Sequence, residues 1–208
     1  MSKKKTYIWR MTYFRNIGFI LRNGLHCCRC AVQDPDYVGI GFKTLINNRG
    51  VWPVNIEPAG VLNDYIPFYF HYKMPMLYNI FNNEVIDYRG RQEEIIYLVS
   101  SAEKVAELRL PFVFTDRHAY VAYKNFFNEY ADLEKLDWRI IKDETWYLQY
   151  TQLRKELKQA EFLIHQHLPV DGILGIVAHN EEIATFVKNE IAAIGLSLKV
   201  AVKPEYYY

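Results

Sequence analysis

The distribution of apolar residues along the chain predicts a series of short β-strands. Runs rich in aromatic and β-branched residues, bounded by polar or glycine-containing segments, are typical of strands. Such runs occupy Tyr7–Met11, Tyr65–Phe70, Glu94–Ser100, Phe112–Thr115, Ala160–His165, Ile173–Ala178 and Ser197–Val202. Pro67 has no backbone N–H to donate, so we expect it at a strand end or on an edge strand.

Apolar residues at helical spacing predict helices between these strands. Residues 16–25 show this spacing, and the segment stops at Gly24, which is typical of a helix C-cap. Further helices are expected at Met74–Ile80, Gln152–Gln159 and Glu181–Gly195. This order of elements, without an internal repeat or a low-complexity linker, predicts an α+β domain with a mixed sheet.

Two long segments are too irregular for extended elements. Between Gln33 and Asp64, glycine, proline and asparagine alternate with isolated apolar residues. We expect an ordered binding loop there, built around a short helix near Lys43–Asn48. Between Asp116 and Tyr150 the chain is aromatic and charged, and we expect it to include helical segments.

The composition fits a single globular domain over residues 1–208. A chain of 208 residues, 50% of them hydrophobic, can bury one sizeable core and is too short for two full domains. Lys and Arg number 25 against 24 Asp and Glu, a balance that does not indicate a histone-like or ribosomal binder of nucleic acid. Any site for a polyanion must therefore be local.

The sequence gives no sign of secretion or of a membrane segment. The basic start at residues 1–5 leads into no apolar segment, and no stretch approaches the length of a membrane span, so we expect a cytoplasmic protein. Cys27, Cys28 and Cys30 form one odd-numbered cluster, which is a poor disulfide framework. No His or Cys group stands at zinc-finger spacing from them, so we expect a loop with free thiols and no metal.

Three polar residues are candidates for chemistry, and spacing alone leaves each of them open. Glu161 begins an apolar strand, where a carboxylate is either exposed at an edge or held in a cleft. Arg49 is a lone cation in a loop rich in glycine and asparagine, which suits a phosphate or a carboxylate but equally a solvated loop. His118 follows a strand and is either functional or a turn residue. The glycine-rich nucleotide-binding patterns are absent.

A set of short motifs carries more information than these single residues. In chain order they are Trp9-Arg10-Met11-Thr12, Asn16-Ile17, Asn23-Gly24-Leu25, Leu62-Asn63-Asp64-Tyr65-Ile66-Pro67-Phe68-Tyr69-Phe70, Pro75-Met76-Leu77, Pro111-Phe112-Val113-Phe114-Thr115-Asp116, His118-Ala119 and Gln159-Ala160-Glu161. Together they resemble the DarT family of DNA ADP-ribosyltransferase toxins, from residue 7 to the tyrosine-rich end. The DYIPFYF block and the FVFTD and QAEF blocks are the specific parts of the resemblance.

The resemblance implies an ADP-ribosyltransferase-like fold with a mixed, mainly antiparallel central sheet flanked by helices. It also implies NAD⁺ as co-substrate and no metal. By the resemblance, Glu161 is the central catalytic residue, with Arg49 and His118 beside it. Arg10-Met11-Thr12 falls on the family's triplet for the nicotinamide end of NAD⁺, where histidine commonly stands in place of the arginine. Thr12 and the backbone of Met11 therefore correspond best.

The remaining site residues divide between the two substrates. For NAD⁺ we expect contacts from Arg10, Met11, Thr12, Asn16, Phe19, Leu45 and Arg49. For DNA we expect contacts from Tyr69, Met76, Arg91, His118, Arg154 and Lys155. The aromatic residues Tyr120, Tyr123, Phe126 and Phe127, interleaved with Lys124, fit either base stacking or core packing.

The resemblance predicts transfer of ADP-ribose from NAD⁺ to a base, thymine in preference to guanine, in single-stranded DNA. The protein would be the toxin of a toxin–antitoxin pair whose antitoxin is a macrodomain resembling DarG. One alternative is the same fold acting on guanine, RNA or protein. The other is a catalytically silent nucleic-acid-binding module.

Overall fold

A central eight-stranded sheet organises residues 5–208, which the computed structural model describes. Its strand order is β10-β9-β4-β1-β3-β7-β5-β6, and only β9 and β10 are parallel neighbours. The strands are β1 Tyr7–Tyr13, β3 Tyr65–Tyr69, β4 Ile95–Ser101, β5 Phe112–Thr115, β6 Phe126–Phe127, β7 Glu161–His165, β9 Gly175–Ala178 and β10 Val200–Val202. A second, two-stranded sheet pairs β2 Leu25–His26 with β8 His167–Leu168. The expected mixed, mainly antiparallel sheet is confirmed.

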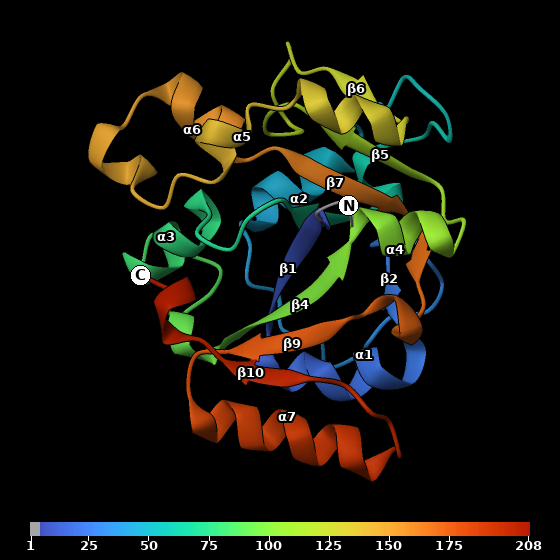
Figure 1. Ribbon diagram of the computed structural model, residues 1–208, viewed down its shortest axis with the longest axis vertical. Helices are drawn as coiled ribbons and strands as arrows, with labels where there is room; N and C mark the ends of the chain where they lie inside the picture. Colours follow the sequence, from blue (N-terminus) through green and yellow to red (C-terminus); the bar gives the residue numbers. More distant parts are fainter. Residues whose placement is uncertain (1–4) are drawn as a thin grey trace.

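The helices are short and flank the sheet (Figure 1). They are α1 Ile17–Asn23, α2 Lys43–Arg49, α3 Pro75–Phe81, α4 Ala102–Glu107, α5 Trp138–Ile141, α6 Gln152–Lys158 and α7 Glu181–Ala193. Helix α7 runs along β9 and β10 at one end of the molecule, while α5 and α6 lie at the other. Within residues 5–208, none of these helices is long and apolar enough to cross a bilayer.

Short 3₁₀ helices make up much of the irregular chain. They span Phe14–Asn16, Leu62–Asp64, Gln92–Glu94, Tyr130–Lys135, Trp146–Gln149 (η5), Val170–Gly172 and Pro204–Tyr206. The expected helical segments between Asp116 and Tyr150 are therefore present. Sequence patterns missed α4, in which the Ser101 hydroxyl accepts a hydrogen bond from the Lys104 N–H and caps the first turn. They also missed the two-residue strands β2, β6 and β8, which are too short to show a periodicity.

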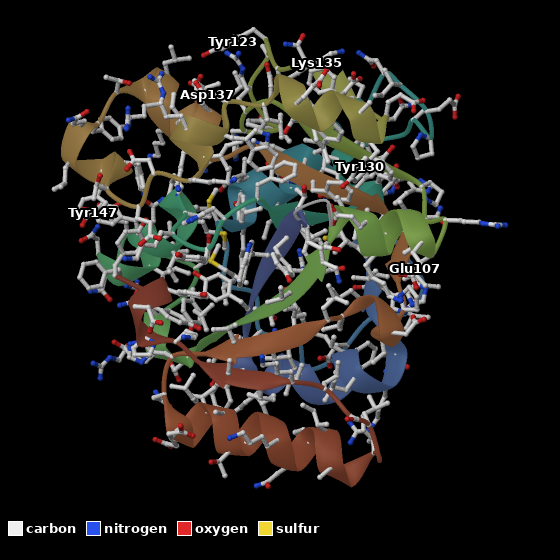
Figure 2. The ribbon with its side chains drawn as sticks, viewed as in Figure 1. Glu107, Tyr123, Tyr130, Lys135, Asp137 and Tyr147 are labelled. Atoms are coloured by element: carbon white, nitrogen blue, oxygen red, sulfur yellow. The ribbon has the colours of Figure 1, made fainter. Side chains whose placement is uncertain are left out.

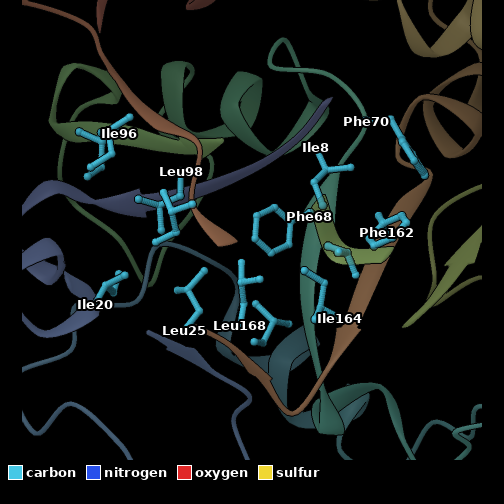
Figure 3. Close-up of a cluster of buried hydrophobic side chains, with 14 of the residues drawn as sticks. Ile8, Ile20, Leu25, Phe68, Phe70, Ile96, Leu98, Phe162, Ile164 and Leu168 are labelled. Atoms are coloured by element: carbon cyan, nitrogen blue, oxygen red, sulfur yellow. The ribbon is translucent and has the colours of Figure 1, made fainter. Parts of the chain in front are cut away.

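Strand β4 shows how the sheet buries both of its faces. All seven of its residues are buried. Ile96 and Leu98 join the core that lies under α1 and α7, whereas Ile95 and Tyr97 join a separate core that includes residues of α3. In the first core, side chains of β1, β3, β4 and β7 interdigitate with Leu25 of β2 and Leu168 of β8 (Figure 3). A strand buried on both faces reads as a continuous apolar run, as this segment does.

The sheet opens between β1 and β3. These two strands share one register pair, Trp9 with Tyr69, whereas β1 pairs with β4 along its whole length. The expectation that Pro67 marks a strand end or an edge is wrong, because it pairs with Leu163 in the middle of an interior strand. The Pro67 carbonyl accepts a hydrogen bond of 2.9 Å from Arg10 Nη1, so this side of Pro67 faces β1. The missing N–H lies on the same side, where the strands have separated and no ladder bond is lost.

Gly24 ends α1 as the sequence predicted. Its φ of 77° lies in the left-handed region that favours glycine. A Cβ at this position would also lie 2.5 Å from the Leu168 carbonyl oxygen of β8. Both the conformation and the close approach of β8 therefore require glycine at the end of α1.

Candidate active site

A deep cleft of about 660 Å³ lies at the opening between β1 and β3. Its walls come from both halves of the sheet, from α1, α2, α3 and α6, and from the loop that precedes α2. The lining includes Arg10, Met11, Thr12, Phe19, Cys28, Leu45, Arg49, Tyr69, Met76, His118, Gln152, Lys155, Glu156, Gln159 and Glu161. A concave site of this size, with a few convergent polar groups, fits a large organic ligand.

Glu161 and Arg49 form a buried ion pair in this cleft. Arg49 Nη1 donates to Glu161 Oε1 at 3.2 Å, and Arg49 Nη2 lies 3.0 Å from Oε2. Glu161 is 1% exposed and Arg49 is 8% exposed, although 112 positions separate them in the sequence. The structure therefore brings the two main sequence candidates into direct contact.

The alternation of side chains along β7 explains the direction of Glu161. Phe162 and Ile164 point into the core, so Glu161, the first residue of the strand, points to the opposite face. The Thr115 hydroxyl accepts a hydrogen bond of 3.1 Å from the Glu161 backbone N–H. The Ala119 N–H donates to Glu161 Oε1 at 3.1 Å. Both supports come from the end of β5 and the turn after it, which carry two of the sequence motifs, although the sequence did not indicate these contacts.

The charges of this pair are mutually stabilised. Burial by itself raises the pKa of Glu161, but the positive charge of Arg49 and the hydrogen bonds to the carboxylate outweigh it, so the pKa is lowered. Burial likewise opposes the charge on Arg49, and Glu161 reverses the effect, so the pKa of Arg49 is raised. Glu161 is therefore a carboxylate at neutral pH.

Some buried polar atoms of the cleft lack a protein partner of good geometry. Among residues 5–208, these include Arg10 Nε, Arg49 Nη2 and Glu161 Oε2. Buried donors and acceptors are normally satisfied, so these atoms are placed to bind a polar ligand. Glu161 Oε2 could accept a hydrogen bond from a sugar hydroxyl, and the two arginine nitrogens could donate to a phosphate.

His118 and Tyr69 complete the polar centre. His118 Nε2 lies 4.0 Å from Glu161 Oε1. Burial lowers the pKa of His118 further than Glu161 raises it, which leaves the imidazole neutral at pH 7. Tyr69 stands directly opposite Glu161 in the β3–β7 pairing. Its hydroxyl lies 3.8 Å from Met76 Sδ, and burial raises its pKa. The side chains of His118, Tyr69 and Met76 thus wall the same part of the cleft.

Most of the residues expected to contact NAD⁺ line the cleft. Besides Arg49, these are Arg10, Met11, Thr12, Phe19 and Leu45. Asn16 does not line the cleft. It is 2% exposed and holds the loop before α2 against β1. Its amide group donates to Thr12 Oγ1 and to the Val38 carbonyl and accepts from the Val38 N–H. Contact of Asn16 with NAD⁺ stays a prediction, and the structure gives the residue a positioning role.

The residues expected to contact DNA are less tightly grouped. Lys155 lines the cleft, as do Tyr69, Met76 and His118. Arg154 turns away and is paired with Asp143. Arg91 lies outside the cleft with an 80% exposed side chain, 3.3 Å from a carboxylate oxygen of Glu93. Direct DNA contacts by Arg154 and Arg91 therefore stay predictions without support from their positions.

The expected stacking aromatics occupy two different settings. Phe126 and Phe127 pack against buried cores, as the alternative reading proposed. Tyr120 lies on Trp52, with ring centroids 4.6 Å apart. Tyr123 is 60% exposed at the outside of the molecule (Figure 2). The aromatic stretch therefore serves packing at one end and remains accessible in its middle.

The cysteine cluster lies at the edge of the cleft, and its thiols are free as expected. Cys27 is buried, and burial together with its hydrogen bond to Cys30 raises the pKa of its thiol to about 11. Cys28 is exposed and lines the cleft. Across residues 5–208, no group of three or more His, Cys, Asp or Glu side chains could hold a metal ion.

Sequence reasoning also missed two cleft residues on α6, Gln152 and Glu156. Gln159 follows them at the end of the helix and also lines the cleft. Glu156 is 6% exposed and accepts hydrogen bonds from Gln152 and Tyr123. A helix with alternating charges is typical of a solvent-exposed surface. The sequence of α6 therefore did not predict that Glu156 is buried.

The chain matches a known protein family over nearly its whole length. Residues 9–208 match the family model described as "ssDNA thymidine ADP-ribosyltransferase, DarT". A DNA ADP-ribosyl transferase of Escherichia coli O127:H6 is 36% identical over 209 residues, covering 100% of this chain and 96% of that protein.

Two solved structures are also similar. Thermus sp. 2.9 DarT in complex with ADP-ribosylated ssDNA has a TM-score of 0.91 at 33% identity, covering 98% of this chain and 97% of that one. The same Thermus protein in complex with NAD⁺ has a TM-score of 0.89 at 32% identity, and each chain is covered completely.

Proposed function

Because the chain belongs to the DarT family of single-stranded-DNA thymidine ADP-ribosyltransferases, we propose that its cleft holds NAD⁺ and a thymine on either side of Glu161 and joins them. The observation that carries this proposal is the buried pair of Glu161 and Arg49, which keeps an ionised carboxylate in the cleft. Its Oε2 is in ionic contact with Arg49 but accepts no hydrogen bond of good geometry. Arg10, Met11, Thr12, Phe19 and Leu45 line the part that would hold NAD⁺.

Glu161 stabilises the positive charge that develops during transfer. The bond between the nicotinamide nitrogen and the ribose breaks, and nicotinamide leaves as a neutral molecule with the electron pair. The ribose then resembles an oxocarbenium ion, which a carboxylate bound to a ribose hydroxyl stabilises selectively. The departing pyridinium is already cationic and needs no general acid. One carboxylate therefore suffices.

Arg49 keeps Glu161 ionised and presents a guanidinium to anionic parts of the substrates. A guanidinium has a pKa above about 12 and does not accept a proton under ordinary conditions. Arg49 Nη2 has no hydrogen-bond partner of good geometry, so it is available to the NAD⁺ diphosphate or to the developing anion of the base. Its planar fork suits both groups.

His118 is the group we assign to the proton of the thymine ring. The acceptor is the ring nitrogen on the pairing edge of thymine, which forms the new bond to ribose and loses its proton. A neutral imidazole at the cleft wall, 4.0 Å from Glu161, has the protonation state and the position of a general base. Tyr69 and Met76 would form the wall against which the base rests.

Single-stranded DNA suits this site because a thymine must enter the cleft out of its stack. Extracting a base from a duplex costs a few kcal/mol. An enzyme that modifies DNA in its own cell is toxic unless the adduct is removed. We therefore assign it the toxin role in a toxin–antitoxin pair in the cytoplasm, with a macrodomain ADP-ribosyl hydrolase resembling DarG as the antitoxin.

Mass spectrometry of short oligonucleotides incubated with NAD⁺ tests the acceptor. We expect one ADP-ribose on thymine, a rate that rises from mildly acidic to mildly alkaline pH, and no reaction of thymine methylated at its pairing-edge nitrogen. An adduct on guanine, or reaction of the methylated base, would overturn the thymine assignment. Modification of RNA or protein in place of DNA would favour the other acceptor classes, and no transfer at all would favour a silent binding module.

A further inference from the structure

Two of the three free thiols in the cysteine cluster lie in contact with each other. Cys27 Sγ and Cys30 Sγ are 2.8 Å apart, joined by a hydrogen bond. A disulfide joins sulfurs about 2.05 Å apart, so the two atoms need to approach by less than about 1 Å to form one. Two residues separate these cysteines, which is the spacing of Cys-x-x-Cys redox pairs. We call residues 27–30 the cysteine turn. The chemistry derived above for the cleft makes no use of it.

Hydrogen bonds to the backbone hold the cysteine turn in the shape that brings the thiols together. The Cys30 N–H donates to the Cys27 carbonyl at 3.2 Å and closes the turn. Gln33 Nε2 donates to the carbonyls of both cysteines, at 2.9 Å for Cys27 and 2.7 Å for Cys30. The Cys27 N–H donates to the Gln166 carbonyl at 2.8 Å. A bond between the two side chains leaves these contacts in place, so the turn is preformed for it.

Contacts on either side fix the cysteine turn to the rest of the fold. Strand β2 leads into it, and Leu25 pairs with Leu168 of β8 in the core shown in Figure 3. Within the turn, Arg29 Nη1 lies 3.4 Å from Asp64 Oδ1, just before β3. Cys28 lines the cleft. A large separation of the two thiols would therefore disturb the edge of the cleft.

The two thiols differ in exposure, which sets the order in which they react. Cys27 is 3% exposed, whereas Cys30 is partly exposed. The Cys30 thiol donates to the Gln166 carbonyl at 3.2 Å, so Cys27 supplies the proton of the hydrogen bond between the thiols. Burial and this hydrogen bond raise the pKa of Cys27 to about 11 and keep it protonated. An oxidant from solution therefore meets Cys30 first, with Cys27 in position for the second step.

We propose that Cys27 and Cys30 are a site of reversible disulfide formation by exchange with a small disulfide such as oxidised glutathione. The Cys30 thiolate attacks one sulfur of the small disulfide, which releases one thiol and leaves a mixed disulfide on Cys30. Cys27 then loses its proton and attacks Cys30 Sγ, which forms the Cys27–Cys30 bond and releases the second thiol. The protein loses two electrons and two protons, and the small disulfide takes up both. An excess of small thiol reverses the exchange.

A metal ion fits this pair less well than a disulfide. A structural zinc site takes four protein ligands. In residues 5–208, no group of three or more His, Cys, Asp or Glu side chains is placed to hold a metal ion. Disulfides of cytoplasmic proteins are usually transient and responsive to the redox state of the cell. The bond would therefore fix the edge of the cleft when small disulfides accumulate and release it when thiols predominate.

Equilibration of the folded protein with mixtures of reduced and oxidised glutathione tests the site. After acid quenching and alkylation, mass spectrometry of the peptide that contains the cysteine turn shows which sulfurs are free, linked to glutathione or joined to each other. We expect a bond between Cys27 and Cys30 in the oxidising mixtures, with Cys28 outside it. An excess of reduced glutathione should restore all three thiols.

Serine variants test the order of the two steps. Cys30→Ser should keep Cys27 as a free thiol in every mixture, because solvent does not reach it. Cys27→Ser should retain glutathione on Cys30, because the second step is lost. Cys28→Ser is the matched control and should form the same Cys27–Cys30 bond as the unchanged protein.

Thermal unfolding shows whether the turn is preformed for the bond. Oxidation should raise the thermal midpoint by about 3–8 °C, from the chain-entropy relation for a closed loop of four residues. Cys28→Ser should show the same rise. Three free thiols in every mixture, glutathione confined to Cys28, or a midpoint that falls on oxidation would overturn the inference. The mass and thermal measurements need no transfer activity, so their outcome is independent of the proposed function.

Discussion

Replacing Arg49 with alanine removes the cation that neutralises a buried carboxylate. Glu161 would keep its hydrogen bond from the Ala119 N–H, but it would lose both contacts to the guanidinium. Removing one partner of a buried pair destabilises a protein by about 3–5 kcal/mol, because the remaining charge is left without compensation. We expect Arg49→Ala to lower the free energy of unfolding by this amount at pH 7 and to abolish transfer.

The loss should depend on pH, and its sign follows from Glu161. In the unchanged protein the pKa of Glu161 is lowered on folding, so its contribution is present at neutral pH and is lost as the pH falls through the folded pKa. In Arg49→Ala, burial is left as the main influence and raises the folded pKa above the unfolded value. Glu161 then destabilises the variant increasingly as the pH rises through that folded pKa. The difference between the two proteins should therefore shrink from pH 7 to pH 5.

Urea unfolding at pH 5, 6 and 7 measures this difference. The double variant Arg49→Ala with Glu161→Gln is the control, because it removes the uncompensated charge. It should recover much of the lost stability at pH 7 and should show little dependence of the difference on pH. A loss below about 1 kcal/mol in Arg49→Ala, or a loss that stays the same from pH 5 to pH 7, would refute the assignment of Arg49 as the partner that keeps Glu161 ionised.

Three further predictions concern single side chains. Glu161→Gln should lower the turnover number by at least about 100-fold and leave the Kd for NAD⁺ within a few fold, since the charge acts mainly in the transition state. A turnover assay measures the first effect and calorimetry the second. A variant that keeps a tenth of the normal turnover would contradict the catalytic role of Glu161. A maleimide should label exposed Cys28 before buried Cys27, and saturating NAD⁺ should slow the labelling, with Cys28→Ser as control; equal rates with and without NAD⁺ would place Cys28 outside the occupied part of the cleft. Lys158 is 0% exposed, and burial lowers its pKa to about 7. The unfolded chain therefore binds more protons than the folded one from about pH 7 to pH 10, and the free energy of unfolding should rise with pH there by up to about 1.4 kcal/mol per unit, a slope that Lys158→Met should flatten.

The local elements of this fold follow from local sequence patterns. Strand β4 is an unbroken apolar run because both of its faces are buried, and such a run can be recognised without a structure. Helix α1 and its end at Gly24 follow from apolar spacing and from the conformational freedom of glycine. The motifs at Asp64–Phe70, Phe112–Asp116 and Gln159–Phe162 together were sufficient to identify the family.

The assembled site depends on contacts between distant segments. The sequence placed Glu161 at the start of a strand but left open whether the carboxylate faces solvent or a cleft. The order of strands decides this, because it sets Tyr69 opposite Glu161 and brings Arg49 across from 112 positions away. The sequence predicted a strand end or an edge for Pro67 because proline cannot donate a hydrogen bond to a neighbouring strand. Strands β1 and β3 separate at Pro67, so no hydrogen bond is missing there. The residues next to Pro67 in the sequence do not indicate this separation.

The same reason explains where the structure places three further residues. Ligand contacts of Asn16, Arg91 and Arg154 were expected from the family resemblance and stay predictions. In the folded chain these residues lie against Val38, Glu93 and Asp143. A polar side chain takes whichever partner the folded chain brings within reach. The sequence by itself therefore determined which residue types the site contains, and the tertiary structure decided which of them meet.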